Sequence, residues 1–267
     1  MPDVVIAGAA GRMGSRLVAL LQEEKGLRLV GALEAPGHPA LQKDAGEVAG
    51  IGRVNVPITG DPDGVLGPDR ILIEFSVPEA SLAHLRAVAR QRGRAVIGTT
   101  GFSAAQRQEI EGLAQETAVL LSPNMSVGVN VAFRVLREMA RLLGDDYDVE
   151  IAEVHHRFKK DAPSGTALRM AEVVAQALGR DLTRTAIYGR HGMPGERTRS
   201  EIGILSQRSG DVVGEHTVSF GALGERLELT HRAHSRATFA RGALRAARFI
   251  AEAEPGLYSM QDVLGLA

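Results

Sequence analysis

The sequence predicts an α/β protein, with a doubly wound parallel sheet in its first part and an α+β domain with a mixed sheet in its second part. Three observations support this. Short, β-branched apolar runs alternate with helix-length amphipathic segments through the first half of the chain, which is typical of parallel sheets. A glycine-rich turn follows the first of these runs, as in Rossmann-like domains. The second half contains short alternating runs broken by glycines, which indicate strands of a separate sheet.

The composition limits the classes of function. The 267 residues are 44% hydrophobic, which is enough for a substantial core in one large domain or two ordinary ones. The formal net charge of -1 gives no overall attraction to nucleic acid or to an acidic membrane surface, and no apolar run is long enough to span a bilayer, so we expect neither partner. Because the chain has no cysteine, disulfides, thiolate nucleophiles and zinc–thiolate sites are excluded, which suits a cytoplasmic protein.

The first candidate site is the turn after the strand expected over 3–7. It consists of Gly8, Ala9, Ala10, Gly11, Arg12, Met13 and Gly14, and an apolar helical stripe follows. In such turns the glycines allow a tight bend and a close approach of a pyrophosphate to the helix start. The spacing GxxGxxG is a variant of GxGxxG, and an ordinary strand-to-helix turn is the alternative. The strand expected over 28–33 ends at Glu34, where a ribose-binding acid is expected, so we predict a dinucleotide site.

Regular elements resume after a long connection that has room for one short strand. We predict strands over 71–76, 95–100 and 119–122, and helices over 78–92 and 103–117. Polar or glycine-bearing turns at the ends of these strands contain Phe75, Gly98, Thr99, Thr100, Ser122, Pro123, Asn124 and Met125. Because the carboxyl ends of parallel strands share one edge of the sheet, we predict that these turns line the cofactor site, although each alone could simply cap a strand.

The second domain is expected to begin with an amphipathic helix over 126–143. We assign its apolar stripe to Val131, Val135, Met139 and Leu142. A strand over 149–154 and a helix from Thr166 come next. The short runs between 185 and 229 fit hairpins, and therefore a mixed or largely antiparallel sheet. A final helix over 236–253 and a short docked tail complete the chain.

A basic turn between the strand over 149–154 and the helix from Thr166 concentrates positive charge. It contains His155, His156, Arg157, Lys159 and Lys160, with only Asp161 to offset them. Such a cluster repels itself unless an anion binds in it. Adjacent residues of a strand point to opposite faces and only Glu153 shares the face of His155, so we expect no metal site. Histidine titrates near neutrality, which favours an acid/base role; one histidine packed in the core is the alternative.

The start of the helix beyond this basic turn suits a carboxylate. Ser164, Gly165 and Thr166 supply backbone N–H groups, two hydroxyls and a glycine that lets a ligand approach closely. Together with Lys159, this predicts a small-molecule substrate that carries more than one carboxylate. For Lys160 we retain a solvated position in the loop.

The motifs EVHHRFKKDAPSGTAL, GAAGRMG, GTTGF, PNMSVGVN and GDVVGEHTVSF resemble those of the 4-hydroxy-tetrahydrodipicolinate reductase family, over essentially the whole chain. The resemblance implies a cytoplasmic, usually homotetrameric enzyme of the diaminopimelate route to lysine. It implies reduction of 4-hydroxy-tetrahydrodipicolinate to tetrahydrodipicolinate, with loss of water, by NADH or NADPH. It also implies a dinucleotide-binding domain of residues 1–126 and 237–267, and a substrate-binding and oligomerisation domain of residues 127–236.

The resemblance further implies roles for individual residues. His155 and Lys159 would form the acid/base pair, and His156, Gly165 and Thr166 would hold the substrate. The cofactor would contact residues 8–13, Glu34, residues 98–100 and residues 122–125.

Two positions depart from the family's pattern. Ala35 stands where some relatives place an arginine for the 2′-phosphate of NADPH, and only His38 and Arg12 are obvious local substitutes, which favours NADH. Phe158 stands where many relatives have a third histidine. From the residues alone, three other functions stay open. They are a dehydrogenase of another dicarboxylate, a non-catalytic NAD(H)-binding redox sensor and, more remotely, a metal-dependent hydrolase.

Overall fold

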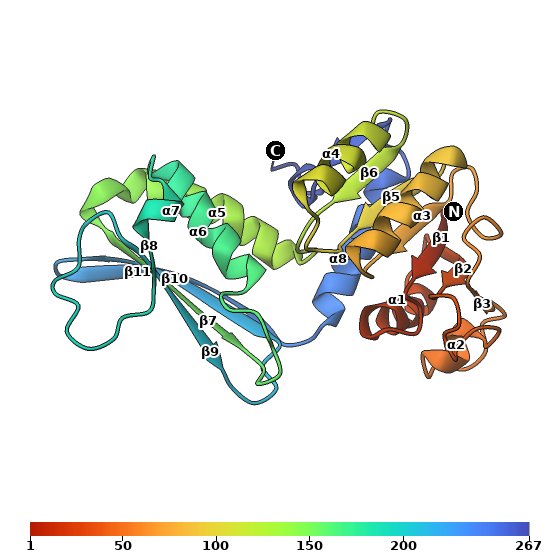
Figure 1. The fold of residues 1–267 in the computed structure, drawn as a ribbon, viewed down its shortest axis with the longest axis horizontal. Coiled ribbons are helices and arrows are strands. Elements are labelled where there is room, and N and C mark those ends of the chain that lie inside the picture. The colour runs from red at the N-terminus through yellow and green to blue at the C-terminus, as the bar shows by residue number, and fades with distance from the viewer. Residues whose placement is uncertain (267) are drawn as a thin grey trace. The chain divides into compact units, whose positions relative to one another are not determined.

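The computed structural model describes residues 1–266, which fold into two compact units (Figure 1). The first unit contains Met1–Val127 together with the C-terminal residues from Ala237 on, and the second contains Gly128–Arg236. These bounds lie within one residue of the domain limits expected from the sequence. No helix among residues 1–266 has both the length and the apolar character needed to cross a membrane.

A seven-stranded sheet forms the centre of the first unit. Its strands are β1 (Asp3–Ala7), β2 (Arg28–Leu33), β3 (Ile58–Thr59), β4 (Ile71–Glu74), β5 (Arg94–Ile97), β6 (Ala118–Leu121) and β12 (Gly256–Tyr258). They lie in the order β12-β6-β5-β4-β1-β2-β3, and every neighbouring pair is parallel. The predicted Rossmann-like parallel sheet is therefore confirmed, and the chain's tail adds an edge strand to it.

Helices cover both faces of this sheet. They are α1 (Arg12–Glu23), α2 (Ala45–Val48), α3 (Pro78–Arg90), α4 (Ala104–Leu113), α8 (Ala237–Ile250) and α9 (Met260–Val263). Alternate residues of one strand serve the two faces, as strand geometry requires. In β1, Val4 and Ile6 pack with α1 and α8, whereas Val5 and Ala7 pack with α3 and α4. Since both faces are buried, the strands are mainly apolar apart from charged residues at some of their ends, and this explains why the sequence indicates them.

A five-stranded mixed sheet forms the second unit. Its strands are β7 (Asp148–His155), β8 (Ala186–Tyr188), β9 (Ile202–Arg208), β10 (Gly214–Ala222) and β11 (Glu225–Ala233), and its helices are α5 (Val127–Leu143), α6 (Gly165–Ala177) and α7 (Leu182–Thr185), with a 3-10 turn at Gly144–Asp146. The strand order is β11-β10-β7-β9-β8. The helices cover one face, and no helix among the described residues covers the other (Figure 1).

The expectation of hairpins between 185 and 229 was only partly right. β10 and β11 form an antiparallel hairpin, but β8 pairs with β9 in parallel, and β9 pairs with β7 in parallel. β7, which is earlier in the chain, lies between β9 and β10. Strand order depends on pairing between distant segments, and the glycine-bounded runs do not encode it.

The apolar stripe assigned to α5 was wrong at three of its four positions, since of these residues only Met139 packs against the core of the second unit. Val131, Val135 and Leu142 are exposed, and the helix buries Val129, Ala132, Phe133, Leu136 and Ala140 instead. Both stripes have helical spacing, so periodicity alone could not choose between them. Packing against the sheet selects the stripe that contains the aromatic ring of Phe133.

The inner face of the mixed sheet changes from apolar to polar along its strands. Two successive rows across β9, β7, β10 and β11 are Ile204, Ile151, Val218 and Leu229, and then Ser206, Glu153, His216 and His231. The first row belongs to the hydrophobic core of the second unit. The second row brings one carboxylate and two imidazoles to the end of the sheet, where the basic turn begins.

Candidate functional site

The turns predicted to bind the cofactor lie at one edge of the parallel sheet. β6, β5, β4, β1 and β2 are successive parallel neighbours, so their carboxyl ends point the same way. The residues proposed for this site, Gly8 to Met13, Glu34, Phe75, Gly98 to Thr100 and Ser122 to Met125, all follow these five ends. The fold thus brings together four turns and an acidic residue that are far apart in the sequence.

The glycine turn between β1 and α1 has the geometry that a pyrophosphate needs. Gly8 adopts a φ of 65°, which favours glycine. A Cβ atom on Gly14 would lie 2.0 Å from the carbonyl oxygen of Gly8, so only glycine permits this contact of helix and turn. The N-cap of α1, Gly11, makes no side-chain cap, and the first turn has no acidic residue. The helix start therefore fits an anionic group.

Glu34 is fixed beside the glycine turn. Its Oε1 accepts a hydrogen bond of 2.9 Å from the N–H of Ala10, and its Oε2 accepts one of 3.1 Å from the N–H of Ala35. A carboxylate held in this place can accept hydrogen bonds from a ribose diol. It would repel a 2′-phosphate, and the side chain of Ala35 supplies no compensating cation.

The three remaining turns are held in shape by their own contacts. A Cβ atom on Gly98 would lie 2.2 Å from the ring of Phe75, so the glycine makes room for that ring. The buried hydroxyl of Thr99 shares a hydrogen bond of 2.7 Å with Ser81. The hydroxyl of Ser122 donates to the carbonyl oxygen of Asn124 at 3.0 Å. These turns are therefore preformed parts of the same edge, as a dinucleotide site requires.

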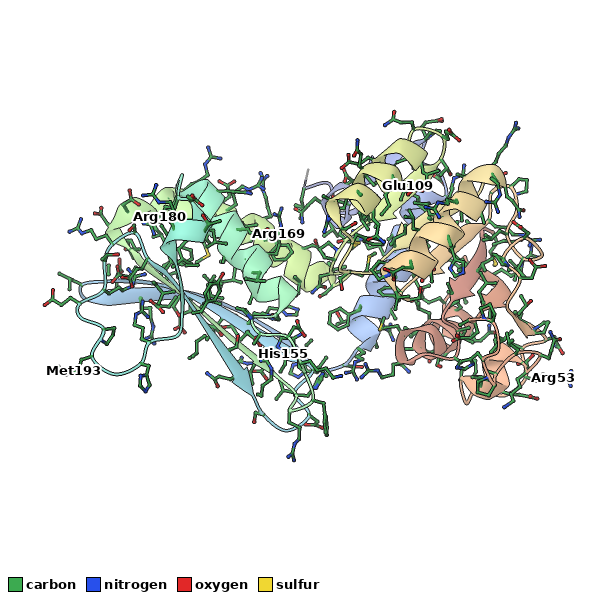
Figure 2. The ribbon with its side chains drawn as sticks, viewed as in Figure 1. Arg53, Glu109, His155, Arg169, Arg180 and Met193 are labelled. Carbon is green, nitrogen blue, oxygen red and sulfur yellow. The ribbon has the colours of Figure 1, made fainter. Side chains whose placement is uncertain are left out.

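The basic turn lies in the second unit. Figure 2 shows His155 at one end of the mixed sheet, and it is the last residue of β7. His156 follows the strand end and accepts a hydrogen bond from the N–H of Lys159 at 3.1 Å. The ammonium of Lys159 donates to both carboxylate oxygens of Asp161 at 2.8 Å. Lys160 is exposed, as its solvated position requires.

Ser164 begins α6 as its N-cap, and Gly165 is the first helical residue. The hydroxyl oxygen of Ser164 accepts the N–H of Ala167 at 3.2 Å and lies 3.0 Å from Nε2 of His216. His216 was not singled out from the sequence. The alternation of His216 with the apolar Val218 and Phe220 along one strand was the signal that could have identified it as an inward-facing residue.

The protonation state of His216 follows from its burial and from the hydrogen-bond partners of its two ring nitrogens. Burial, reinforced by the nearby charge of His155, lowers the pKa of His216 to about 3, so the ring is neutral. Its Nδ1 is buried and has no partner among residues 1–266. A buried N–H without an acceptor costs more than an unshared lone pair, so the proton belongs on Nε2, which donates to Ser164. The hydroxyl proton of Ser164 is then left for a ligand.

The fully buried carboxylate of Glu153 contacts several residues of the same site. Glu153 accepts hydrogen bonds from the backbone N–H of Ser164 at 3.1 Å and from Arg208, and its Oε2 lies 2.5 Å from Nδ1 of His155. Partial burial lowers the pKa of His155, and the interaction with Glu153 opposes that effect. Arg208 was also missed from the sequence, because only the register of β7 with β9 places it opposite His155.

The groups gathered at this second site are of the kinds that can bind an anion and donate a proton to it. The site combines a helix start, a hydroxyl, an ammonium and two imidazoles. Nδ1 of His156 is a further buried polar atom without a partner in the part of the chain that the structure describes. Among those residues, no group of three or more His, Cys, Asp or Glu side chains is arranged to hold a metal ion.

A parallel nucleotide-binding sheet joined to a unit with an anion-binding acid/base site defines a two-domain NAD(P)-dependent oxidoreductase. The family model described as dihydrodipicolinate reductase, N-terminus, matches residues 2–125, and that described as dihydrodipicolinate reductase, C-terminus, matches residues 128–264. The chain belongs to the dihydrodipicolinate reductase family. The resemblance found in the sequence motifs is therefore confirmed.

Individual relatives agree with this assignment. The chain is 54% identical, over 99% of both chains, to a 4-hydroxy-tetrahydrodipicolinate reductase of Syntrophus aciditrophicus (strain SB). It is 53% identical, over 100% of both chains, to the enzyme of the same name from Citrifermentans bemidjiense. Among solved structures, it resembles dipicolinate-bound dihydrodipicolinate reductase from Paenisporosarcina sp. TG-14 with a TM-score of 0.74 and 25% identity, over 98% of both chains.

We expect the stability of the wild-type chain to fall on acidification more steeply than that of a His216→Gln variant. The pKa of His216 moves from its ordinary value of 6.5 to about 3 on folding, so between these values the unfolded chain binds a proton that the folded chain excludes. Stability is then lost as the pH falls through this window, by up to about 1.4 kcal/mol per pH unit. Urea unfolding at stepwise pH measures both slopes; equal slopes would contradict the buried neutral ring.

Proposed function

We propose that the chain reduces 4-hydroxy-tetrahydrodipicolinate to tetrahydrodipicolinate with NADH or NADPH, in the biosynthesis of diaminopimelate and lysine. The observation that carries this proposal is the 54% identity, over 99% of both chains, to a relative of that name. The preformed dinucleotide edge and the anion-binding site of the second unit supply the two binding functions that the reaction needs. In the reaction, the substrate loses its 4-hydroxyl as water and gains a hydride and a proton.

The residues of the second unit would bind the substrate and supply the proton. His156, the start of α6 and the hydroxyls of Ser164 and Thr166 would hold the two carboxylates. His155 and Lys159 would deliver the proton that completes reduction, since imidazolium and ammonium groups both donate protons at suitable pKa values. The bound cofactor supplies the hydride. Hydride addition places negative charge on the substrate ring. Basic groups that are already in place would stabilise this charge, and the proton would then neutralise it.

The residues of the first unit would bind the cofactor. The glycine turn and the start of α1 would hold the pyrophosphate, and Glu34 would accept hydrogen bonds from the ribose. The turns after β4, β5 and β6 would line the nicotinamide half of the site. The fixed carboxylate of Glu34, with Ala35 beside it, favours NADH over NADPH.

Steady-state reduction of the freshly generated heterocyclic substrate, with NADH and NADPH side by side, tests the function and the cofactor preference together. We expect turnover with both cofactors and a higher kcat/KM with NADH, because a 2′-phosphate meets the charge of Glu34 and no arginine at position 35. Binding of NADH without any turnover would favour a redox sensor. Turnover only with a different dicarboxylate would favour another dehydrogenase.

Replacing Lys159 with alanine should lower kcat about 100-fold or more, which is the usual scale of acid/base catalysis. The dissociation constant of NADH, measured by fluorescence titration, should change little, because Lys159 belongs to the second unit. The matched control is Lys160→Ala, which removes the same charge from the neighbouring exposed position and should leave kcat within about twofold. Unchanged turnover in Lys159→Ala would rule out its role as a proton donor.

We also propose that the chain acts in the cytoplasm as a homotetramer. The uncovered face of the mixed sheet supports self-association, since Leu205 on that face is 49% exposed and Met193, in the loop between β8 and β9, is fully exposed. Covering these side chains in an assembly would remove apolar surface from water, which favours association. Sedimentation equilibrium should return the mass of four chains; a monomer at micromolar concentration would contradict the proposal.

A further inference from the structure

Glu153 is an unusual residue for the inside of a protein. Its side chain is fully buried in the second unit, on the inner face of β7. A carboxylate removed from water is costly unless it is paired and fully hydrogen-bonded. The contacts that offset this cost therefore indicate which groups Glu153 holds in position.

The partners of Glu153 come from three different segments. On its own strand, its Oε2 lies 2.5 Å from Nδ1 of His155. From β9, Nη1 of Arg208 donates to Oε1 at 3.1 Å and to Oε2 at 3.0 Å, and Ser206 adds a side-chain hydrogen bond. The backbone N–H of Ser164 donates to Oε1 at 3.1 Å. One carboxylate thus connects the candidate proton donor to the start of the substrate-binding helix.

The charge state of Glu153 decides the tautomer of His155. Burial raises the pKa of Glu153, but the hydrogen bonds from His155, Ser206 and Arg208, together with the charge of His155, outweigh it and leave the pKa below its ordinary value. The carboxylate is therefore ionised at neutral pH and can only accept hydrogen bonds. The proton of neutral His155 must then sit on Nδ1, and Nε2 becomes the nitrogen that exchanges protons.

The opposite side of the His155 ring is kept clear. A Cβ atom on Gly214 would lie 2.9 Å from Nε2 of His155, so any larger residue at this position would press against that nitrogen. Glycine at position 214 keeps the space beside Nε2 free of a side chain, as the exchange of a proton with a ligand requires. The buried ring of His216 packs edge-on against His155, with 5.2 Å between ring centroids, and prevents rotation toward the core.

We propose that Glu153 is the positioning residue of this site, which fixes His155 with Nδ1 protonated and Nε2 toward the substrate, and which ties that ring to Ser164. The proposal rests on the proposed function, in which His155 handles a proton. The charged or titratable groups that face His155 are Glu153 on its own strand, Lys159 in the basic turn, Arg208 on β9 and His216 on β10. Of these only Glu153 is an anion, so it alone raises the proton affinity of the ring.

A Glu153→Gln variant keeps the shape of the side chain and removes its charge. We expect the pKa of His155, followed by the NMR signal of its ring, to fall by about one unit, as for a group that loses an adjacent opposite charge. The limb of the kcat/KM pH profile that reports His155 should move to lower pH by the same amount. kcat should fall about tenfold or more, while KM for NADH stays unchanged.

The matched control is Glu150→Gln, three positions earlier on β7. Glu150 lies on the opposite face and pairs with Arg190 and Arg197, away from His155. This variant removes an arginine-paired carboxylate from the same strand and should leave both the pKa of His155 and the pH profile unaltered. A folded Glu153→Gln variant that shows the same result as this control would overturn the proposal.

A measurement on the wild-type chain covers the case in which Glu153→Gln does not fold. Nitrogen-15 shifts of labelled histidine, assigned by comparison with His155→Gln, report which ring nitrogen carries the proton at high pH. The proposal requires Nδ1, and an Nε2-protonated ring would refute it. This measurement needs no turnover, so it separates failure of the positioning role from failure of the proposed reaction.

Discussion

The ion pair of the buried Glu153 with Arg208 is the interaction on which the proposed substrate site depends. Removing the charge of Arg208 would leave a fully buried carboxylate without its cation, which costs several kcal/mol in typical proteins. This ion pair lies at one end of the mixed sheet, next to rows of apolar side chains. One carboxylate thereby determines the orientation of His155 and contacts the start of α6 at Ser164, two groups that the sequence places nine residues apart.

The two units solve the same problem of binding an anion with different amounts of charge. At the first unit, backbone N–H groups of a glycine turn and a helix start would meet the phosphates, and the side chain that hydrogen bonds fix beside them is the negative Glu34. At the second, a helix start is combined with Lys159 and two histidines. The difference follows from the chemistry required, since a pyrophosphate has only to be held, whereas the substrate must also receive a proton.

Much of this architecture was predictable because the local sequence patterns agree with the burial that the folded chain imposes. The strands of the first unit are buried on both faces, so their apolar runs stand out. Glu34 was recognised because the length of one βα unit fixes its distance from the glycine turn. In contrast, the stripe of α5 was misassigned, because Val131 and Val135 have the same spacing as the buried Ala132 and Leu136. Periodicity finds a helix, but packing chooses its face.

By itself, the sequence determined the class of fold, the glycine turn, the basic turn and the family, since each of these can be recognised from short stretches of consecutive residues. Only the tertiary structure decided the partners of these residues. The parallel register of β7 with β9 places Arg208 beside Glu153, and the antiparallel register with β10 places His216 behind Ser164. Strand register is set by the fit of whole sheets and helices. No local pattern records it, which is why the groups that orient the site emerged only from the fold.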